Sequence, residues 1–255
     1  MKAWHRFKKS YLFYSFKRDP VAIGSFTILM ILVTIGLAAP IVAPYNTYDA
    51  STIDIMNAET PPSWMESGRK EFILGTDIQG RCLLSTMIYG LRVSFIIGCG
   101  AVLVQAFIGI LTGLFAGYLG GKLDSFLMRV TDIQFSIPYL IVAIFAGAIF
   151  KLAFGVGRYE EMAVPLLIII IGVSHWPIYA RTVRASVLGE KSKEYVEAAR
   201  VIGLSRWPIM YRHILPNTMT PVLVISTIQV AEAVMSEAAL SFLGLGMPIT
   251  KPSLG

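Results

Sequence analysis

The chain has 255 residues, of which 55% are hydrophobic and only 15% are charged, and its net charge is +6. An average soluble domain carries about 25% charged residues, so this composition argues against an ordinary soluble protein and indicates lipid around much of the chain. The positive charge does not indicate nucleic-acid binding, because the basic residues gather in particular segments between apolar windows.

Five windows are mostly apolar and contain no Asp, Glu, Lys or Arg: residues 20–48, 93–121, 133–150, 162–180 and 213–231. A helix needs about 17–25 such residues to cross a bilayer. The sequence therefore predicts an all-α integral membrane protein, a polytopic helical bundle with five spans.

The basic residues are distributed unequally between the connecting segments. Segments 1–19, 121–132 and 181–212 hold 15 Lys and Arg, whereas the alternate segments 45–91, 151–161 and 241–255 hold 6. Loops rich in Lys and Arg stay in the cytoplasm, so we expect a cytoplasmic N-terminus. The predicted organisation is a cytoplasmic interfacial segment (1–19) followed by a transmembrane domain (20–255), with an external loop at 44–91 and a cytoplasmic loop at 181–216.

The N-terminal segment is both aromatic and basic. Trp4, Phe7, Tyr11 and Tyr14 recur at helical spacing, with lysines and arginines between or beside them. This pattern fits a helix lying on the inner membrane surface or an ordinary positively charged anchor. In the external loop we expect a short helix at 83–89. The loop contains Cys82, whose role the sequence does not indicate.

The second span carries a stripe of glycines, Gly109, Gly113 and Gly117, at intervals of four residues. Small residues at this spacing let another helix approach closely, so the stripe predicts helix packing. Lining of a transport path is the alternative.

Three titratable residues fall in or near spans. His175 is interpreted as an interfacial histidine beside Trp176, with a proton relay as the alternative. Glu232 is a candidate for substrate or gating contact, against helix packing or solvation. Glu237, named with it as a pathway or gating candidate, is expected near the outer interface, where water can reach it.

The most ordered connecting segment is 190–217. Ser192 can cap a first helix, Gly203 suits the positive φ of a helix end, and Ser205 can cap a second helix that Pro216 ends. The predicted apolar face of the first helix consists of Tyr195, Ala198, Ala199 and Ile202. The pattern indicates a docking surface, and an amphipathic hairpin on the inner leaflet is the alternative.

The same segment resembles a known signature. Glu197-Ala198-Ala199, then Gly203, and His213-Ile214-Leu215-Pro216 are similar to the EAA motif of ATP-binding cassette importer permeases, although His213 replaces an aliphatic residue. The runs Arg212–Asn217, Leu74–Asp77 with Gly80 and Arg81, and Leu240–Gly246 resemble the C-type subunit of the dipeptide, oligopeptide and nickel branch.

The resemblance implies a type I importer permease fold and assigns no catalytic, metal or cofactor role to this chain. The expected coupling residues are Tyr195, Glu197, Ala198, Ala199, Gly203 and Pro216. The implied partners are a second homologous permease forming a heterodimer, two ATPase subunits that bind ATP and Mg²⁺, an external peptide-binding protein and membrane lipid, all at a bacterial inner membrane. Such permeases have six spans, and Gly255 falls where the outer loop before the sixth is expected.

Two other functions agree less well with the sequence. An intramembrane enzyme would be expected to carry a GxSG serine, an HExxH pair or paired membrane aspartates, and the sequence has none. A proton-coupled secondary transporter of a small solute would use Glu232, but no inverted repeat is evident. The sequence does not select among dipeptides, longer peptides, nickel chelates and antimicrobial peptides as cargo.

Overall fold

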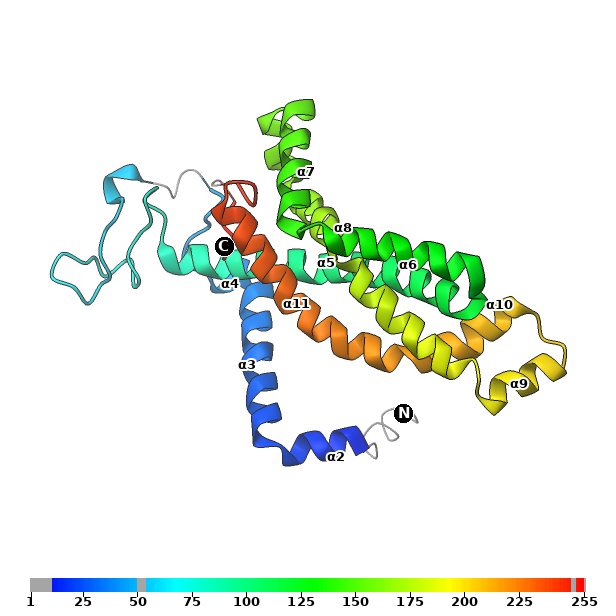
Figure 1. Cartoon of the computed structure of the whole chain (residues 1–255). Helices are drawn as coiled ribbons and strands as arrows, with labels where there is room; N and C mark the ends of the chain where they lie inside the picture. The colour runs from blue at the N-terminus through cyan, green and yellow to red at the C-terminus, as the bar shows by residue number, and fades with distance from the viewer. Residues whose placement is uncertain (1–10, 50–53, 249–250, 255) are drawn as a thin grey trace. The chain divides into compact units, whose positions relative to one another are not determined.

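The computed structural model describes residues 11–49, 54–248 and 251–254. These form two compact units, Met1–Arg92 and Val93–Gly255, which are considered separately. Figure 1 shows that the described chain is built from helices and connecting segments, and Thr76 and Cys82 form an isolated antiparallel bridge. The predicted all-α architecture is confirmed.

The first unit begins with helices α2 (Tyr11–Arg18) and α3 (Pro20–Leu37). Asp19 separates them, and its carboxylate accepts hydrogen bonds from the backbone N–H groups of Val21 and Ala22 at 2.9 and 3.2 Å. A carboxylate cap followed by proline in the first turn favours a helix start here. Of the predicted interfacial helix, Trp4 and Phe7 lie outside the described residues.

Helix α3 is apolar on all sides, and only 6% of its apolar window is buried within the chain. A helix that is hydrophobic all round requires a membrane or another apolar partner to cover it. The unit continues through α4 (Ala39–Val42) and the 3₁₀ turn η2 (Ile55–Asn57), and its small core joins Ala39 to Ile88 and Tyr89.

The prediction of a separate short helix at 83–89 is wrong, because these residues are the first turns of α5 (Leu83–Leu119). No proline occurs between residues 83 and 119, and Arg92 does not interrupt the backbone hydrogen bonds of a helix. Cys82, just before α5, is 4% exposed and pairs with Thr76 through the isolated bridge.

The second unit contains most of α5 and the remaining elements, which follow in chain order. They are α6 (Gly121–Ser136), α7 (Tyr139–Phe154), α8 (Val156–Glu190), α9 (Glu194–Val201), α10 (Arg206–Pro208), the π-helical segment η3 (Ile209–Ile214), the 3₁₀ segment η4 (Leu215–Thr218) and α11 (Met219–Phe242).

Four helical segments among the described residues are long and apolar enough to cross a membrane: 20–37, 83–119, 156–190 and 206–242. A fifth crossing is possible only if α6 and α7, which meet at 83°, together form one bent span. The third span expected at 133–150 therefore corresponds to the end of α6 and most of α7, with the bend between them. Proline at 138 disfavours a helical conformation at Ile137, whose backbone is extended (φ −99°, ψ 119°).

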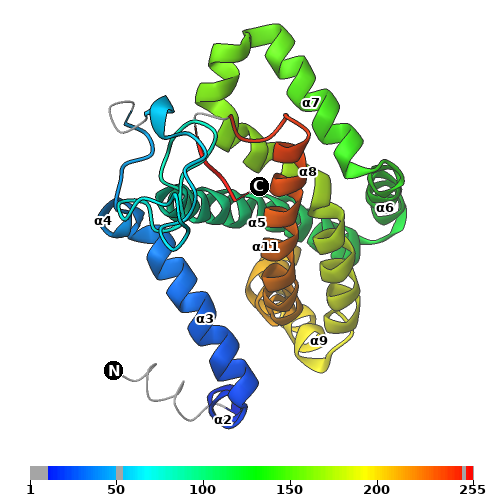
Figure 2. The ribbon, with the colours of Figure 1, turned by 90° about the vertical axis from the view of Figure 1, so that its left-hand side faces the viewer.

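Helix α8 is the centre of the second unit. It packs against α7 and α11, as Figure 2 shows, and also against α6. Two apolar cores result. The α9-side core joins α8 to α5, α9, η3 and α11, and the α7-side core joins α8 to α5, α7 and α11.

Candidate functional site

The glycine stripe of α5 lies against α8. A Cβ atom at Gly109 would come within 2.6 Å of the Trp176 carbonyl oxygen, and one at Gly117 would come within 2.8 Å of Val187 Cβ. A Cβ atom at Gly113 would meet the Ala180 carbonyl oxygen and lie 2.8 Å from Val183 Cβ. Real Cβ atoms essentially never make contacts below 3.0 Å, so α5 and α8 approach this closely because these positions lack side chains.

Polar contacts add to this packing near the C-terminal end of α8. The Arg184 guanidinium forms two hydrogen bonds with the Asp124 carboxylate of α6, the Nη2–Oδ2 distance being 2.6 Å. The Lys191 ammonium donates to the Gly117 carbonyl oxygen at 2.9 Å. Residues 121–132, expected to be a short connection between spans, are therefore part of a helix fixed to α8 by an ion pair.

Helix α9 is held to this end of the unit by one side only. Val196 is fully buried and Ala199 is 4% exposed, both within the α9-side core. Of the predicted apolar face, only Ala199 is buried in this chain, whereas Tyr195, Ala198 and Ile202 are exposed, Ile202 by 79%. The spacing in the sequence misses Val196, whose neighbours in the core come from η3 and α8.

The opposite side of α9 is exposed. Glu197, Ala198, Val201 and Ile202 follow one another at helical spacing, and we call them, with Glu194, the outer face of α9. Val201 is 87% exposed, and in the described part of the chain Glu197 makes no ion pair. An apolar stripe that is flanked by carboxylates and faces away from its own core suits contact with another protein.

The start of α9 is organised by a tyrosine rather than by the expected serine. The cap residue is Lys193, and the Ser192 hydroxyl donates instead to the Gly189 carbonyl oxygen at 3.1 Å. The Tyr195 hydroxyl donates to Glu190 Oε2 at 2.6 Å and accepts from Asn217 Nδ2 at 3.2 Å. Burial and the neighbouring Glu190 carboxylate raise the pKa of this hydroxyl, so it remains a donor at neutral pH. It ties α9 to both α8 and η4.

The turn after α9 places Gly203 at φ +86°, a conformation that favours glycine, and a Cβ atom there would meet no other group within 4 Å. Ser205 stands at the next helix start, although its side chain makes no capping hydrogen bond. Pro216 does not end the second helix. A π-helical segment followed by a 3₁₀ segment accommodates the missing N–H, and the helix continues from Arg206 to Phe242.

A buried carboxylate lies in the same unit. Glu237 is fully buried, so the expectation that water reaches it is wrong. Its oxygens accept hydrogen bonds from Ser241 Oγ at 2.7 Å and Ser94 Oγ at 3.2 Å. Those two hydroxyl oxygens in turn accept from the backbone N–H groups of Met247 and Leu254. The carboxylate has no Lys, Arg or His partner among the described residues.

The other predicted site residues, Glu232 and His175, belong neither to the outer face of α9 nor to the hydrogen bonds of Glu237. Glu232 is exposed on α11 and has no hydrogen-bond partner in the described part of the chain. His175 packs its ring 4.9 Å from that of Tyr139, and its Nδ1 lies 3.3 Å from the Ile171 carbonyl oxygen. The sequence does not indicate the importance of Val196 or of Ser94, because the residues that they contact are distant in the chain.

Comparison with known proteins adds to this geometry. Residues 109–255 match the family model described as the binding-protein-dependent transport system inner membrane component, and residues 1–62 match the N-terminal TM domain of oligopeptide transport permease C.

Individual relatives agree. The chain is 36% identical over 241 residues to the di/tripeptide transport system permease protein DppC of Pseudomonas aeruginosa, covering 94% of this chain and 75% of that protein. It is 33% identical over 240 residues to the dipeptide transport system permease protein DppC of Haemophilus influenzae, with 94% and 77% covered. It is 32% identical over 240 residues to the oligopeptide transport system permease protein OppC of Bacillus subtilis, with 94% and 72% covered.

Proposed function

This chain belongs to the family of binding-protein-dependent transport system inner membrane components and is a permease of an ATP-binding cassette importer, and from that premise we propose that it forms half of a pathway for short peptides. The family implies ATPase and binding-protein partners. Membership of this family supports an importer permease over a proton-coupled secondary transporter. The peptide cargo is supported by the relatives, whose names specify dipeptide, di/tripeptide and oligopeptide transport.

The observation that carries the mechanism is the two-sided character of α9. Its inner residues, Val196 and Ala199, are buried in a core shared with α8 and η3, whereas Val201 and Ile202 of its outer face are exposed. We assign the outer face, including Glu197 and Ala198, to contact with an ATPase subunit in the cytoplasm. The excess of Lys and Arg in segments 1–19 and 181–212 supports a cytoplasmic position for this loop and for the N-terminus.

Force applied to α9 would reach two spans directly. Its buried face belongs to the same apolar core as Val183 and Val187 of α8, and it also contacts η3, which continues into α11. ATP and Mg²⁺ are assigned to the partner subunits, since this chain has no GxxxxGK[ST] loop. Coupling requires the ATPase to bind the outer face differently in its two nucleotide states, because only a differential interaction shifts a conformational equilibrium.

Docking is tested with a pair of matched substitutions. Ile202 is 79% exposed after α9, and Ile55 is 77% exposed in the loop that we assign to the opposite side of the membrane. We expect Ile202→Asp to lose the ATPase subunits on affinity purification and to abolish ATP-driven uptake of a labelled dipeptide. Ile55→Asp should retain the ATPases. Full retention and normal uptake by Ile202→Asp would contradict the assignment.

The turn at Gly203 is tested separately, because there is space for a side chain but the backbone has φ +86°. Gly203→Val forces a β-branched residue into this conformation and should weaken the coupling of ATP hydrolysis to uptake. Gly203→Asn should retain most of the coupling, since Asn tolerates the left-handed region. Equal uptake by the two variants at equal abundance would argue against a role for the turn.

The second half of the pathway is assigned to a homologous permease. The uncovered surface of α3 and the exposed Glu232 of α11 face away from the cores of their own units, which supports contact with a partner or a pathway. Glu232 and Glu237 are the gating candidates of this proposal. Gentle purification should yield this chain with a second permease and two ATPases. A stable lone protein would contradict it.

A further inference from the structure

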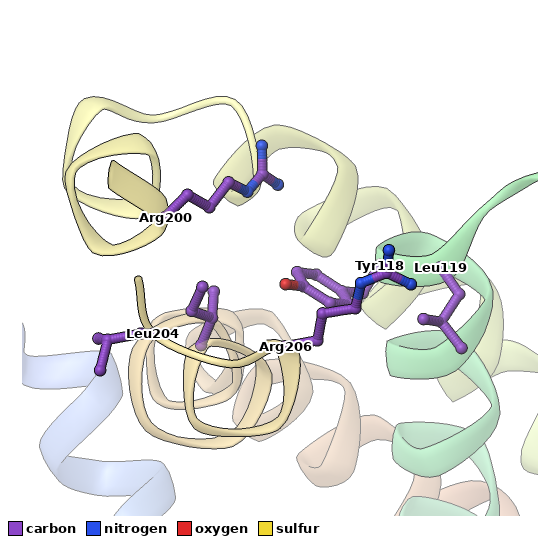
Figure 3. Close-up of a pocket in the computed structure, with 6 residues that line it drawn as sticks. Tyr118, Leu119, Arg200, Leu204 and Arg206 are labelled. Atoms are coloured by element: carbon purple, nitrogen blue, oxygen red, sulfur yellow. The ribbon is translucent and has the colours of Figure 1, made fainter. Parts of the chain in front are cut away.

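A hollow of about 500 Å³ lies between the end of α5 and the segment that joins α9 to α10. It is lined by Tyr118, Leu119, Arg200, Leu204, Arg206 and Ile209. Figure 3 shows that the Arg200 side chain extends from α9 and that the Arg206 side chain lies alongside Tyr118, with its guanidinium on the side of Leu119. No carboxylate is among the lining residues, so the hollow presents two positive charges and a hydroxyl.

These polar groups are not used by the chain itself. In the described residues, neither guanidinium forms an ion pair or a hydrogen bond, unlike Arg184, which is paired with Asp124. The Tyr118 hydroxyl likewise has no hydrogen-bond partner in that part of the chain. Two arginines that line one hollow without an acid favour an oxyanion, and guanidinium groups match phosphate oxygens in geometry.

A second, smaller hollow of about 200 Å³ adjoins the first and shares Tyr118, Leu119 and Arg206 with it. Its remaining lining residues are Trp207 and Met210, so this part is mainly apolar. The Trp207 indole is 59% exposed and is held in place by the rings of Phe115 and Tyr211, each with its centroid 6.0 Å away. A cationic hollow therefore continues into an apolar one.

The two hollows lie at the end of an apolar helix. Leu119 is the last residue of α5, an apolar helix long enough to cross a bilayer. Tryptophan and tyrosine are enriched at the interface between hydrocarbon and water, and basic pockets between spanning helices bind anionic lipid headgroups. A free phosphate would use the arginines but not the apolar extension.

We propose that Arg200, Arg206 and Tyr118 bind the phosphate of an anionic phospholipid, with its acyl chain along Leu119, Trp207 and Met210. The lipid would occupy the junction between α5, α9 and the start of the last span, and so would contribute to the position of α9. The shared chemistry is a phosphate oxyanion, which inorganic phosphate could also supply. An acidic side chain of a partner protein is the competing occupant.

The test uses the complete importer complex, reconstituted in phosphatidylcholine nanodiscs with phosphatidylglycerol added and then examined by native mass spectrometry. The variant is Arg200→Gln with Arg206→Gln. The matched control is Arg129→Gln with Arg212→Gln, which removes the same charge from exposed positions of α6 and η3. A basic residue at an anionic membrane contributes roughly fivefold to binding, so the double variant should retain phosphatidylglycerol about 25-fold more weakly. The control should bind it like the wild type.

A third variant separates the two sources of phosphate. Trp207→Ala should reduce retention of phosphatidylglycerol while leaving any binding of radiolabelled inorganic phosphate unchanged. If inorganic phosphate binds as well as the lipid and Trp207→Ala has no effect, the lipid assignment is overturned. It is also overturned if the Arg200 and Arg206 double variant keeps its phosphatidylglycerol. If that variant in addition loses the ATPase subunits, a partner's carboxylate is the occupant of the hollow.

Discussion

The two ends of the unit formed by residues 93–255 differ in where their charged groups lie. At the α9 end the core is apolar, and the charged partners, such as Arg184 and Asp124, lie around it. At the other end the fully buried carboxylate of Glu237 has hydroxyl groups as its partners. The difference indicates that apolar packing stabilises the α9 end, whereas hydrogen bonds to a buried carboxylate, which are sensitive to charge, stabilise the other end.

The largest effect is expected from breaking the packing at the α9 end. Gly113→Val places a branched side chain against the Ala180 carbonyl oxygen and Val183 Cβ of α8. Because backbone cannot move aside as a flexible side chain can, we expect a loss of about 3 kcal/mol, the upper part of the overpacking range, and little folded protein. The measurement is the yield and thermal unfolding midpoint of the purified complex.

The control for this variant is Gly189→Ala in α8, where a Cβ atom meets nothing within 4 Å. Replacing an exposed helical glycine by alanine should stabilise the helix by about 0.5–1 kcal/mol. Similar losses in both variants would mean that the close approach of α5 to α8 is not what the glycines provide.

Two substitutions of Glu237 test the role of the buried carboxylate at the end opposite α9. Glu237→Leu removes the acceptors of the Ser94 and Ser241 hydroxyl groups, the first of them buried, which should destabilise the unit by about 2 kcal/mol. Glu237→Gln keeps an acceptor oxygen and should lose much less. Differential scanning fluorimetry of the complex would measure both changes. If Gln is as damaging as Leu, the charge of the carboxylate, and not its hydrogen bonds, is what matters.

The smallest effect is expected at the surface of the α9 end. Tyr195→Phe removes the hydroxyl that joins Glu190 to Asn217 but leaves the buried Val196 in place. We expect a loss of about 1 kcal/mol, which is typical of one hydrogen-bond network at a partly exposed site. Hydrogen exchange of the α9 amides should rise while that of α8 stays the same. An equal rise throughout α8 would show that the hydroxyl supports the whole unit.

Much of the fold can be predicted because membrane helices are specified locally. The apolar windows, the absence of charge within them and Gly203 with its positive φ are properties of neighbouring residues. The 83° bend between α6 and α7 also has a local cause, Pro138 acting on Ile137, but hydropathy alone does not indicate it. The helical path through Pro216 escapes prediction because π-helical and 3₁₀ turns leave no simple periodic signal.

The sequence by itself determined the class of the protein, the number of apolar segments and the family signature around Glu197 and Gly203. Only the tertiary structure decided that Val196, and not Ile202, fixes α9, that Glu237 is buried, and that Arg200 and Arg206 line one hollow with Tyr118. The physical reason is that propensity and hydropathy act between residues close in the chain. The environment of a side chain, by contrast, depends on which distant helices pack against it.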